Sequence, residues 1–223
     1  MKEAKDIRVL IACEQSGAVR EEFKKLGFDA WSCDLIESDI PGNHLVQSAL
    51  EVMYQGWDLM IGHPPCTHLA VSGAKHFKKK IALGKQQASL DFVRLLMSAP
   101  IKHKAIENPV SVISSNIRKP DQIIQPWQFG DEAQKTTCLW LENLPLLEHT
   151  EIVGKGEFYV SPSGKKLPKW YSDNKSSKSR SKTFMGIARA MATQWGQFLL
   201  DENSGIELPG TNSSNENQVS LFQ

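Results

Sequence analysis

The fold is decided by the stretch Trp57-Asp58-Leu59-Met60-Ile61-Gly62-His63-Pro64-Pro65-Cys66-Thr67. Its apolar run, residues 59–61, predicts a short buried strand. Gly-His-Pro-Pro then ends the strand, because two prolines can neither donate to a sheet nor continue it. Open α/β sheets bind ligands at the carboxyl ends of their strands, so Cys66 is placed to act as a nucleophile. The alternative is that Cys66 is a small buried hydrophobic residue.

Length and composition restrict the class of protein. Hydrophobic residues make up 40% and charged residues 23% of the 223 positions, which fits one globular domain. No apolar run is long enough to span a membrane, and the charged N-terminus lacks the core of a signal peptide. The four scattered cysteines argue against a metal site and a disulfide framework, so we expect a cytoplasmic protein without a membrane partner.

The N-terminal region predicts a strand, loop, helix and second strand. The strand at 7–12 breaks at Cys13-Glu14-Gln15-Ser16-Gly17, a helix follows at 18–26, and a strand at 28–33 ends at Asp34. An acidic residue at the end of the second strand is the layout of a nucleotide-type cofactor site.

Further elements predict an α/β fold with a doubly wound, mostly parallel sheet over residues 1–200. A strand at 103–106 is ended by Glu107-Asn108-Pro109, and a late strand covers 137–141. The helix expected at 85–98 has an apolar stripe of Ala88, Phe92, Leu95 and Leu96. We also expect a short helix at 48–54 and an amphipathic helix at 183–200, with Ile187, Met191, Trp195 and Phe198 on its buried side.

Residues 152–182 form a basic segment with eight Lys and Arg against two acidic residues. It has few apolar residues and several Gly, Pro and Ser, so a flexible lobe or lid is expected. Its charges are either a solvated surface or contacts for phosphates, and Lys165, Lys166, Lys169 and Arg180 are the candidate contacts.

Cys66 and Glu107 follow two strands whose carboxyl ends meet at one sheet edge. A thiolate and a carboxyl at one site suit attack on an electron-poor pyrimidine ring. The thiolate adds to carbon 6, and the carboxyl stabilises the product at ring nitrogen 3. Carbon 5 then becomes nucleophilic and can take a methyl group from a sulfonium donor.

The chain resembles the DNA cytosine-5 methyltransferases, and above all their short phage and prophage members. The resemblance rests on Ser16-Gly17, Asp34, Pro65-Cys66, Glu107-Asn108, the region 134–147 and the region 180–195. It implies a sheet of the S-adenosylmethionine-dependent methyltransferase type and methyl transfer to carbon 5 of cytosine in DNA.

Residue roles follow from this resemblance. Cys66 is the expected nucleophile, Glu107 the proton donor, and Asn108 a brace for the loop. S-adenosylmethionine is the expected cofactor, with Asp34 on its ribose hydroxyls and Glu14, Ser16, Gly17 and Pro64 as further contacts. Lys135 lies in the region that helps hold the extruded base.

Alternatives remain open. A large target-recognition domain is missing, which favours the same chemistry on a nucleotide, on RNA or with a modified sulfonium donor. A non-catalytic methyltransferase-like protein that binds DNA or a clamp is a second alternative. Amino-methyltransferases also carry Pro-Pro, but His63 and Cys66 do not fit attack by an exocyclic amine.

The C-terminal residues 201–223 are rich in Asn, Ser, Glu and Gly and predict a disordered tail. It ends in Gln218-Val219-Ser220-Leu221-Phe222-Gln223, which resembles the peptide that binds the bacterial β sliding clamp. Gln218, Leu221 and Phe222 are its expected contacts. The alternative is a chance match.

Overall fold

The computed structural model describes residues 2–162, 164, 166–174 and 176–205. Its centre is a seven-stranded sheet of order β3-β2-β1-β4-β5-β7-β6, in which β7 runs antiparallel to both neighbours and the other pairs are parallel. The strands are β1 (Arg8–Ala12), β2 (Asp29–Asp34), β3 (His44–Val46), β4 (Leu59–Gly62), β5 (His103–Pro109), β6 (Gln122–Ile124) and β7 (Thr137–Glu142). This confirms the expected α/β class with a mostly parallel sheet.

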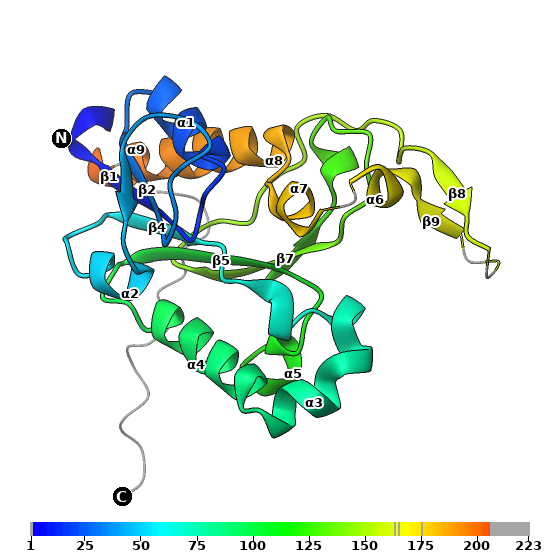
Figure 1. The fold of residues 1–223 in the computed structure, drawn as a ribbon. Coiled ribbons are helices and arrows are strands. Elements are labelled where there is room, and N and C mark those ends of the chain that lie inside the picture. The colour runs from blue at the N-terminus through cyan, green and yellow to red at the C-terminus, as the bar shows by residue number, and fades with distance from the viewer. Residues whose placement is uncertain (1, 163, 165, 175, 206–223) are drawn as a thin grey trace, which may run out of the picture.

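Helices cover both faces of the sheet (Figure 1). One face carries α1 (Ala18–Lys25), α8 (Met185–Ala190) and α9 (Gly196–Asn203); a π-helical turn, η5 (Met191–Trp195), joins the last two. The other face carries α2 (Ala49–Val52), α3 (Phe77–Ala82), α4 (Lys85–Met97) and α5 (Ile113–Asn116). No helix in the described part of the chain is long and apolar enough to cross a membrane.

Each face of the sheet buries its own hydrophobic core. Side chains alternate along a strand, so Leu59 and Ile61 of β4 join the core under α1 and α8, while Met60 joins the core under α4. A strand buried on both faces needs a continuous apolar run. The central strands could therefore be predicted from the sequence.

The helix α4 lies in the expected place but buries a different face. Its buried residues are Gln86, Leu90, Val93 and Leu96, whereas Ala88 and Leu95 of the predicted stripe are exposed. The helix has apolar residues on two sides. The side with Leu90, Val93 and Leu96 packs against the sheet, so Ala88 and Leu95 are left exposed. Of the predicted stripe, Leu96 is buried and Phe92 is half-buried against the same core, so the prediction was wrong at Ala88 and Leu95.

Two predicted boundaries were also wrong. The strand β5 does not end at residue 106; it continues through Glu107 to Pro109, because β7 pairs with all of 104–109. The C-terminal helix does not end at residue 200, because Glu202 accepts hydrogen bonds from Lys102 (2.6 Å) and His103 (3.0 Å) and holds the last turn of α9. The rest of the predicted tail, 206–223, lies outside the described residues.

The basic segment 152–182 has regular structure. The strands β8 (Phe158–Val160) and β9 (Lys166–Pro168) form an antiparallel hairpin that projects beside the main sheet, followed by α6 (Lys169–Asp173) and α7 (Ser177–Ser181) (Figure 1). The hairpin pairs within itself and leaves the main sheet's strand order unchanged. Each of its strands is only three residues long, which is too short for an apolar pattern to identify it in the sequence.

Candidate active site

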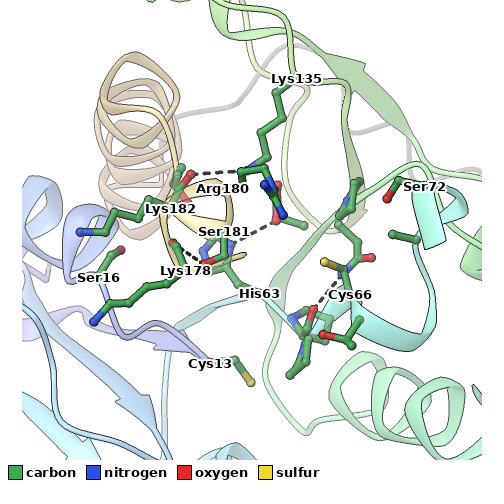
Figure 2. A pocket seen from close by; sticks show the side chains of 18 of the residues that line it. Cys13, Ser16, His63, Cys66, Ser72, Lys135, Lys178, Arg180, Ser181 and Lys182 are labelled. Carbon is green, nitrogen blue, oxygen red and sulfur yellow. Dashed lines mark hydrogen bonds and ion pairs between the residues drawn. The ribbon is translucent and has the colours of Figure 1, made fainter. Parts of the chain in front are cut away.

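A cavity of about 890 Å³ opens at the carboxyl ends of the central strands. It brings together most of the site residues expected from the sequence, from six separate parts of the chain. Those that line it are Glu14, Ser16, Asp34, Pro64, Cys66, Glu107, Asn108, Lys135 and Arg180. In Figure 2, Ser16 lies beside Lys178 and Lys182, and Cys66 lies on the opposite side of the pocket near Ser72.

The turn after β4 sets the position of Cys66. The backbone N–H of His63 donates to Ala12 (2.9 Å), after which Pro64 and Pro65 lead the chain away from the sheet. The 3-10 turn η2 (Cys66–His68) begins at the cysteine, whose carbonyl accepts from Leu69 and Ala70. The cysteine is thus held on a stiff turn at the mouth of the cavity.

Burial raises the pKa of the half-buried Cys66 thiol, and the Glu107 carboxylate raises it further. Lys135 and Lys80 oppose this shift without overcoming it. Cys66 therefore rests as a thiol near neutral pH and must lose its proton before it can act as a nucleophile.

Glu107 lies on β5, where its side chain is 12% exposed. Burial alone would raise the pKa of this carboxyl, but the imidazole of His63 and the charge of Lys135 together hold it below the ordinary value. His63 Nδ1 lies 3.4 Å from Glu107 Oε2. Sequence reasoning did not assign His63 to the site, although a histidine at the end of a buried strand was a usable signal.

Asn108 joins the two strand ends. Its buried side-chain amide donates a 2.8 Å hydrogen bond to the carbonyl of Pro64. This bond connects β5 to the turn that carries Cys66, which is the bracing position expected for Asn108.

Glu14 and Ser16 organise the loop after β1. Glu14 is buried, and its carboxylate accepts hydrogen bonds from the backbone N–H groups of Val19 (2.7 Å) and Arg20 (3.3 Å) at the start of α1. Ser16 Oγ donates to Glu14 Oε1 and accepts from Ala18 N, both at 3.3 Å. Glu14 thus satisfies free N–H groups of the helix, the function of an N-terminal cap.

Gly17 occupies a conformation that favours glycine, with φ of +72°. A Cβ at this position would lie 2.8 Å from Nη2 of the buried Arg20. Arg20 in turn donates to Ser32 Oγ (3.0 Å) and to the carbonyl of Ile40 (2.7 Å), so it has little freedom to move. Gly17 therefore keeps the loop close to the backbone that follows β2.

Asp34 ends β2 and accepts a 2.7 Å hydrogen bond from the N–H of Leu35. Leu35 and Ile36 are exposed, with 74% and 53% of their surface accessible. Leu35 also lines a second, mainly apolar hollow of about 420 Å³ with Pro65, Ala88 and Phe92. Apolar surface thus lies next to the acidic residue at this edge of the sheet.

The helix α7 lies across the cavity through ion pairs with Asp39. Lys178 Nζ and Lys182 Nζ lie 2.8 Å and 3.0 Å from the two carboxylate oxygens of Asp39. Lys135 donates to the carbonyl of Lys182 at 3.4 Å. We call the contact of Lys178 and Lys182 with Asp39 the α7 clasp.

Of the remaining basic candidates that the structure describes, Arg180 lines the cavity, whereas Lys166 and Lys169 do not. Arg180 packs its guanidinium 4.8 Å from the ring of Tyr171 and donates to the carbonyl of Asn174. Lys166 lies over the ring of Phe158, and Lys169 pairs with Glu157, so both belong to the hairpin region rather than to the lining of the cavity within the described chain. Lys165, Gln218, Leu221 and Phe222 lie outside the described residues.

No family model matches the chain, and comparison with curated proteins finds no significant match.

Proposed function

We propose that this protein transfers a methyl group from S-adenosylmethionine to carbon 5 of cytosine in DNA through a covalent adduct with Cys66. The observation that carries the proposal is that Cys66 and Glu107, from adjacent parallel strands, line one cavity. A nucleophile and a proton-donating carboxyl at one site are what addition to a cytosine ring requires.

The thiolate of Cys66 forms a bond to carbon 6 of the ring. The displaced electron pair moves toward ring nitrogen 3, which takes a proton from Glu107. Carbon 5 becomes nucleophilic and would take the methyl group of the sulfonium donor, whose bond from carbon to sulfur breaks to leave a thioether. The carbon 5 proton then leaves to water, the bond between carbon 6 and sulfur breaks, Cys66 is released as the thiolate, and ring nitrogen 3 returns its proton to Glu107.

The residues of the cavity suit the cofactor. S-adenosylmethionine would supply an electrophilic methyl group on a sulfonium sulfur. Asp34 would accept from the ribose hydroxyls, and Ser16 and Gly17 form the loop beside it. Exposed apolar surface for a purine ring is offered by Ile36 in this cavity and by Leu35 in the second hollow. Glu14 would hold the loop of Ser16 and Gly17 in place, and Pro64 would form part of the cavity wall beside the cofactor. The strand order with its antiparallel β7 is compatible with the methyltransferase type of sheet.

The hairpin β8–β9 and the helix α6 are the proposed DNA contacts. A target cytosine must leave the duplex to reach Cys66, and lysines outside the cavity can hold the phosphates that flank it. Changing Lys166 and Lys169 to Gln should weaken DNA binding and reduce its salt dependence. Lys5, near the N-terminus, and Lys24, on α1, are the matched control pair. The N-terminus and α1 lie at the opposite end of the molecule from β8 and β9 (Figure 1).

The same chemistry on a nucleotide or RNA is the second candidate, favoured by the small size of the hairpin. Turnover on duplex DNA, single-stranded DNA, RNA and deoxycytidine monophosphate separates these substrates. A modified sulfonium donor is tested by comparing donors on the preferred substrate.

The proposal is tested with DNA that contains 5-fluorocytosine. Fluorine at carbon 5 blocks release of the adduct, so mass spectrometry should find DNA attached to Cys66 when the cofactor is present. Cys66→Ser should form no adduct and Cys138→Ser should retain it. An adduct on Cys13, Cys33 or Cys138, or none on the wild-type protein, would contradict the proposal.

A further inference from the structure

His63, at the end of β4, contacts the carboxyl group of Glu107 and interacts electrostatically with the buried carboxyl group of Glu14. Its Nδ1 is 3.4 Å from Glu107 Oε2, and its side chain is 12% exposed. Its Nε2 is buried and has no hydrogen-bond partner within the described residues. The backbone bond to Ala12 fixes the residue in the strand ladder. The charged and titratable groups around the pair are Glu14 from the β1–α1 loop, Lys135 from the segment before β7, Cys138 from β7, and Cys66.

Glu107 needs a proton that it does not hold at rest. Its pKa lies below the ordinary value, so the carboxyl is ionised near neutral pH. Protonation of ring nitrogen 3 nevertheless needs a proton at this position. The nearest side chain with an exchangeable proton bonded to Glu107 is His63.

We propose that His63 is a positioning residue that holds the Glu107 carboxylate and stores the proton that Glu107 delivers to ring nitrogen 3. The inference rests on the proposed function. An imidazole retains its proton to higher pH than a carboxyl, since the ordinary pKa values are about 6.5 and 4.3. A His–Glu pair therefore carries a transferable proton at a pH where a carboxyl alone has lost it.

The proton moves in two linked transfers. As the Cys66 sulfur bonds to carbon 6, ring nitrogen 3 takes the proton from Glu107, and Glu107 takes the Nδ1 proton of His63. The imidazole becomes neutral, and Glu107 is again a carboxylate while the adduct exists. When the bond between carbon 6 and sulfur breaks, nitrogen 3 returns its proton to Glu107, which passes it back to His63.

The test is the pH dependence of kcat in His63→Asn. The Asn amide can take the place of Nδ1–H as a hydrogen-bond donor but cannot give up a proton. We expect the pH at which kcat falls on the alkaline side of the profile to move down by about one unit or more. Above this pH, kcat of the variant should be about tenfold lower than that of the wild-type protein. Affinity for S-adenosylhomocysteine, measured by calorimetry, should stay unchanged. His76→Asn, which changes an exposed histidine, should keep the wild-type profile.

A second measurement follows the Glu107 carboxyl directly by carbon-13 NMR titration, with Glu107→Gln used to assign its signal. In His63→Asn the pKa of Glu107 should rise, because the imidazole that lowers it is gone. An unchanged Glu107 pKa would overturn the inference, as would a kcat that falls equally at every pH. If the wild-type protein transfers no methyl group, the proposed function fails; if it does and the limb stays in place, only the role of His63 fails.

Discussion

The side-chain amide of Asn108 donates a hydrogen bond to the carbonyl oxygen of Pro64 over 2.8 Å. This bond crosses from β5 to the turn after β4 and fixes the spacing between the strand that carries Glu107 and the loop that carries Cys66. Both groups of the bond are buried, so water would not take the place of a lost partner. Breaking the bond would therefore cost free energy of folding.

Asn108→Ala should therefore lower both stability and adduct formation. The unpaired Pro64 carbonyl would cost about 1–3 kcal/mol of unfolding free energy. Asn108→Asp should be worse, because a carboxylate cannot donate and repels the carbonyl oxygen. Urea unfolding and the rate of 5-fluorocytosine trapping measure the two effects. Asn116→Ala, at an exposed asparagine, is the control, and equal stability of the Asn108 and Asn116 variants would contradict the bracing role.

Alkylation of Cys66 by iodoacetamide should be slow at neutral pH and should keep rising above the ordinary thiol pKa of about 8.5. Burial and the Glu107 carboxylate raise the pKa of Cys66, so little thiolate exists at lower pH. Glu107→Gln removes one of these causes and should speed the reaction near neutral pH. Peptide mass spectrometry reports the rate at Cys66 itself. A rate that levels off below pH 8 in the wild-type protein would show a thiol already activated without substrate.

Gly17→Ala should destabilise the protein more than Gly84→Ala does. Both glycines have positive φ, +72° and +67°, so each substitution costs about 1–2 kcal/mol for the backbone. Only at Gly17 would the added methyl group also meet the Arg20 guanidinium at 2.8 Å, whereas no described atom lies within 4 Å at Gly84. The difference should be about 1–3 kcal/mol in urea unfolding. Equal losses would mean that Arg20 moves aside freely.

Asp39→Asn should loosen the α7 clasp. Lys178 and Lys182 hold the pKa of Asp39 below its ordinary value. The stabilisation from the clasp is therefore fully present at pH values above the ordinary pKa of Asp39. It is lost as the pH falls through the lowered pKa, where the carboxylate becomes protonated. Amide hydrogen exchange in α7 should become several-fold faster in the variant, and in the wild-type protein at high salt. Glu157→Gln breaks a different exposed ion pair, with Lys169, and should leave α7 unchanged.

The terminal peptide should bind a bacterial β sliding clamp. Leu221 and Phe222 would fill an apolar pocket and Gln218 would anchor beside it, so changing both apolar residues to Ala should abolish binding. Fluorescence anisotropy of the labelled peptide 212–223 against purified clamp measures the affinity. Methyl transfer to short oligonucleotides should be the same with and without residues 218–223. Equal, negligible binding by both peptides would leave the match accidental.

Local patterns were enough to predict the central strands and the site at their edge. A buried parallel strand needs an apolar run, and Pro-Pro or Glu-Asn-Pro placed directly after such a run marks where the chain meets the cavity. Cys66, Glu107 and Asp34 could be assigned because each stands next to one of these patterns.

Features that depend on neighbouring elements could not be predicted. The extension of β5 through Glu107 depends on β7, and the buried face of α4 depends on which apolar stripe the sheet accepts. The partners of His63 and Asp39 come from residues 44 and 139–143 positions away, so no local pattern indicated them.

The separate pairing of β8 with β9 has an evolutionary consequence. Because the described part of this hairpin exchanges no strand hydrogen bonds with the seven-stranded sheet, its length and sequence can change while the ladder beside Cys66 and Glu107 stays intact. Under the proposed function, replacing this one surface ribbon would change the target preference in descendants of the chain and leave the residues at the sheet edge unaltered.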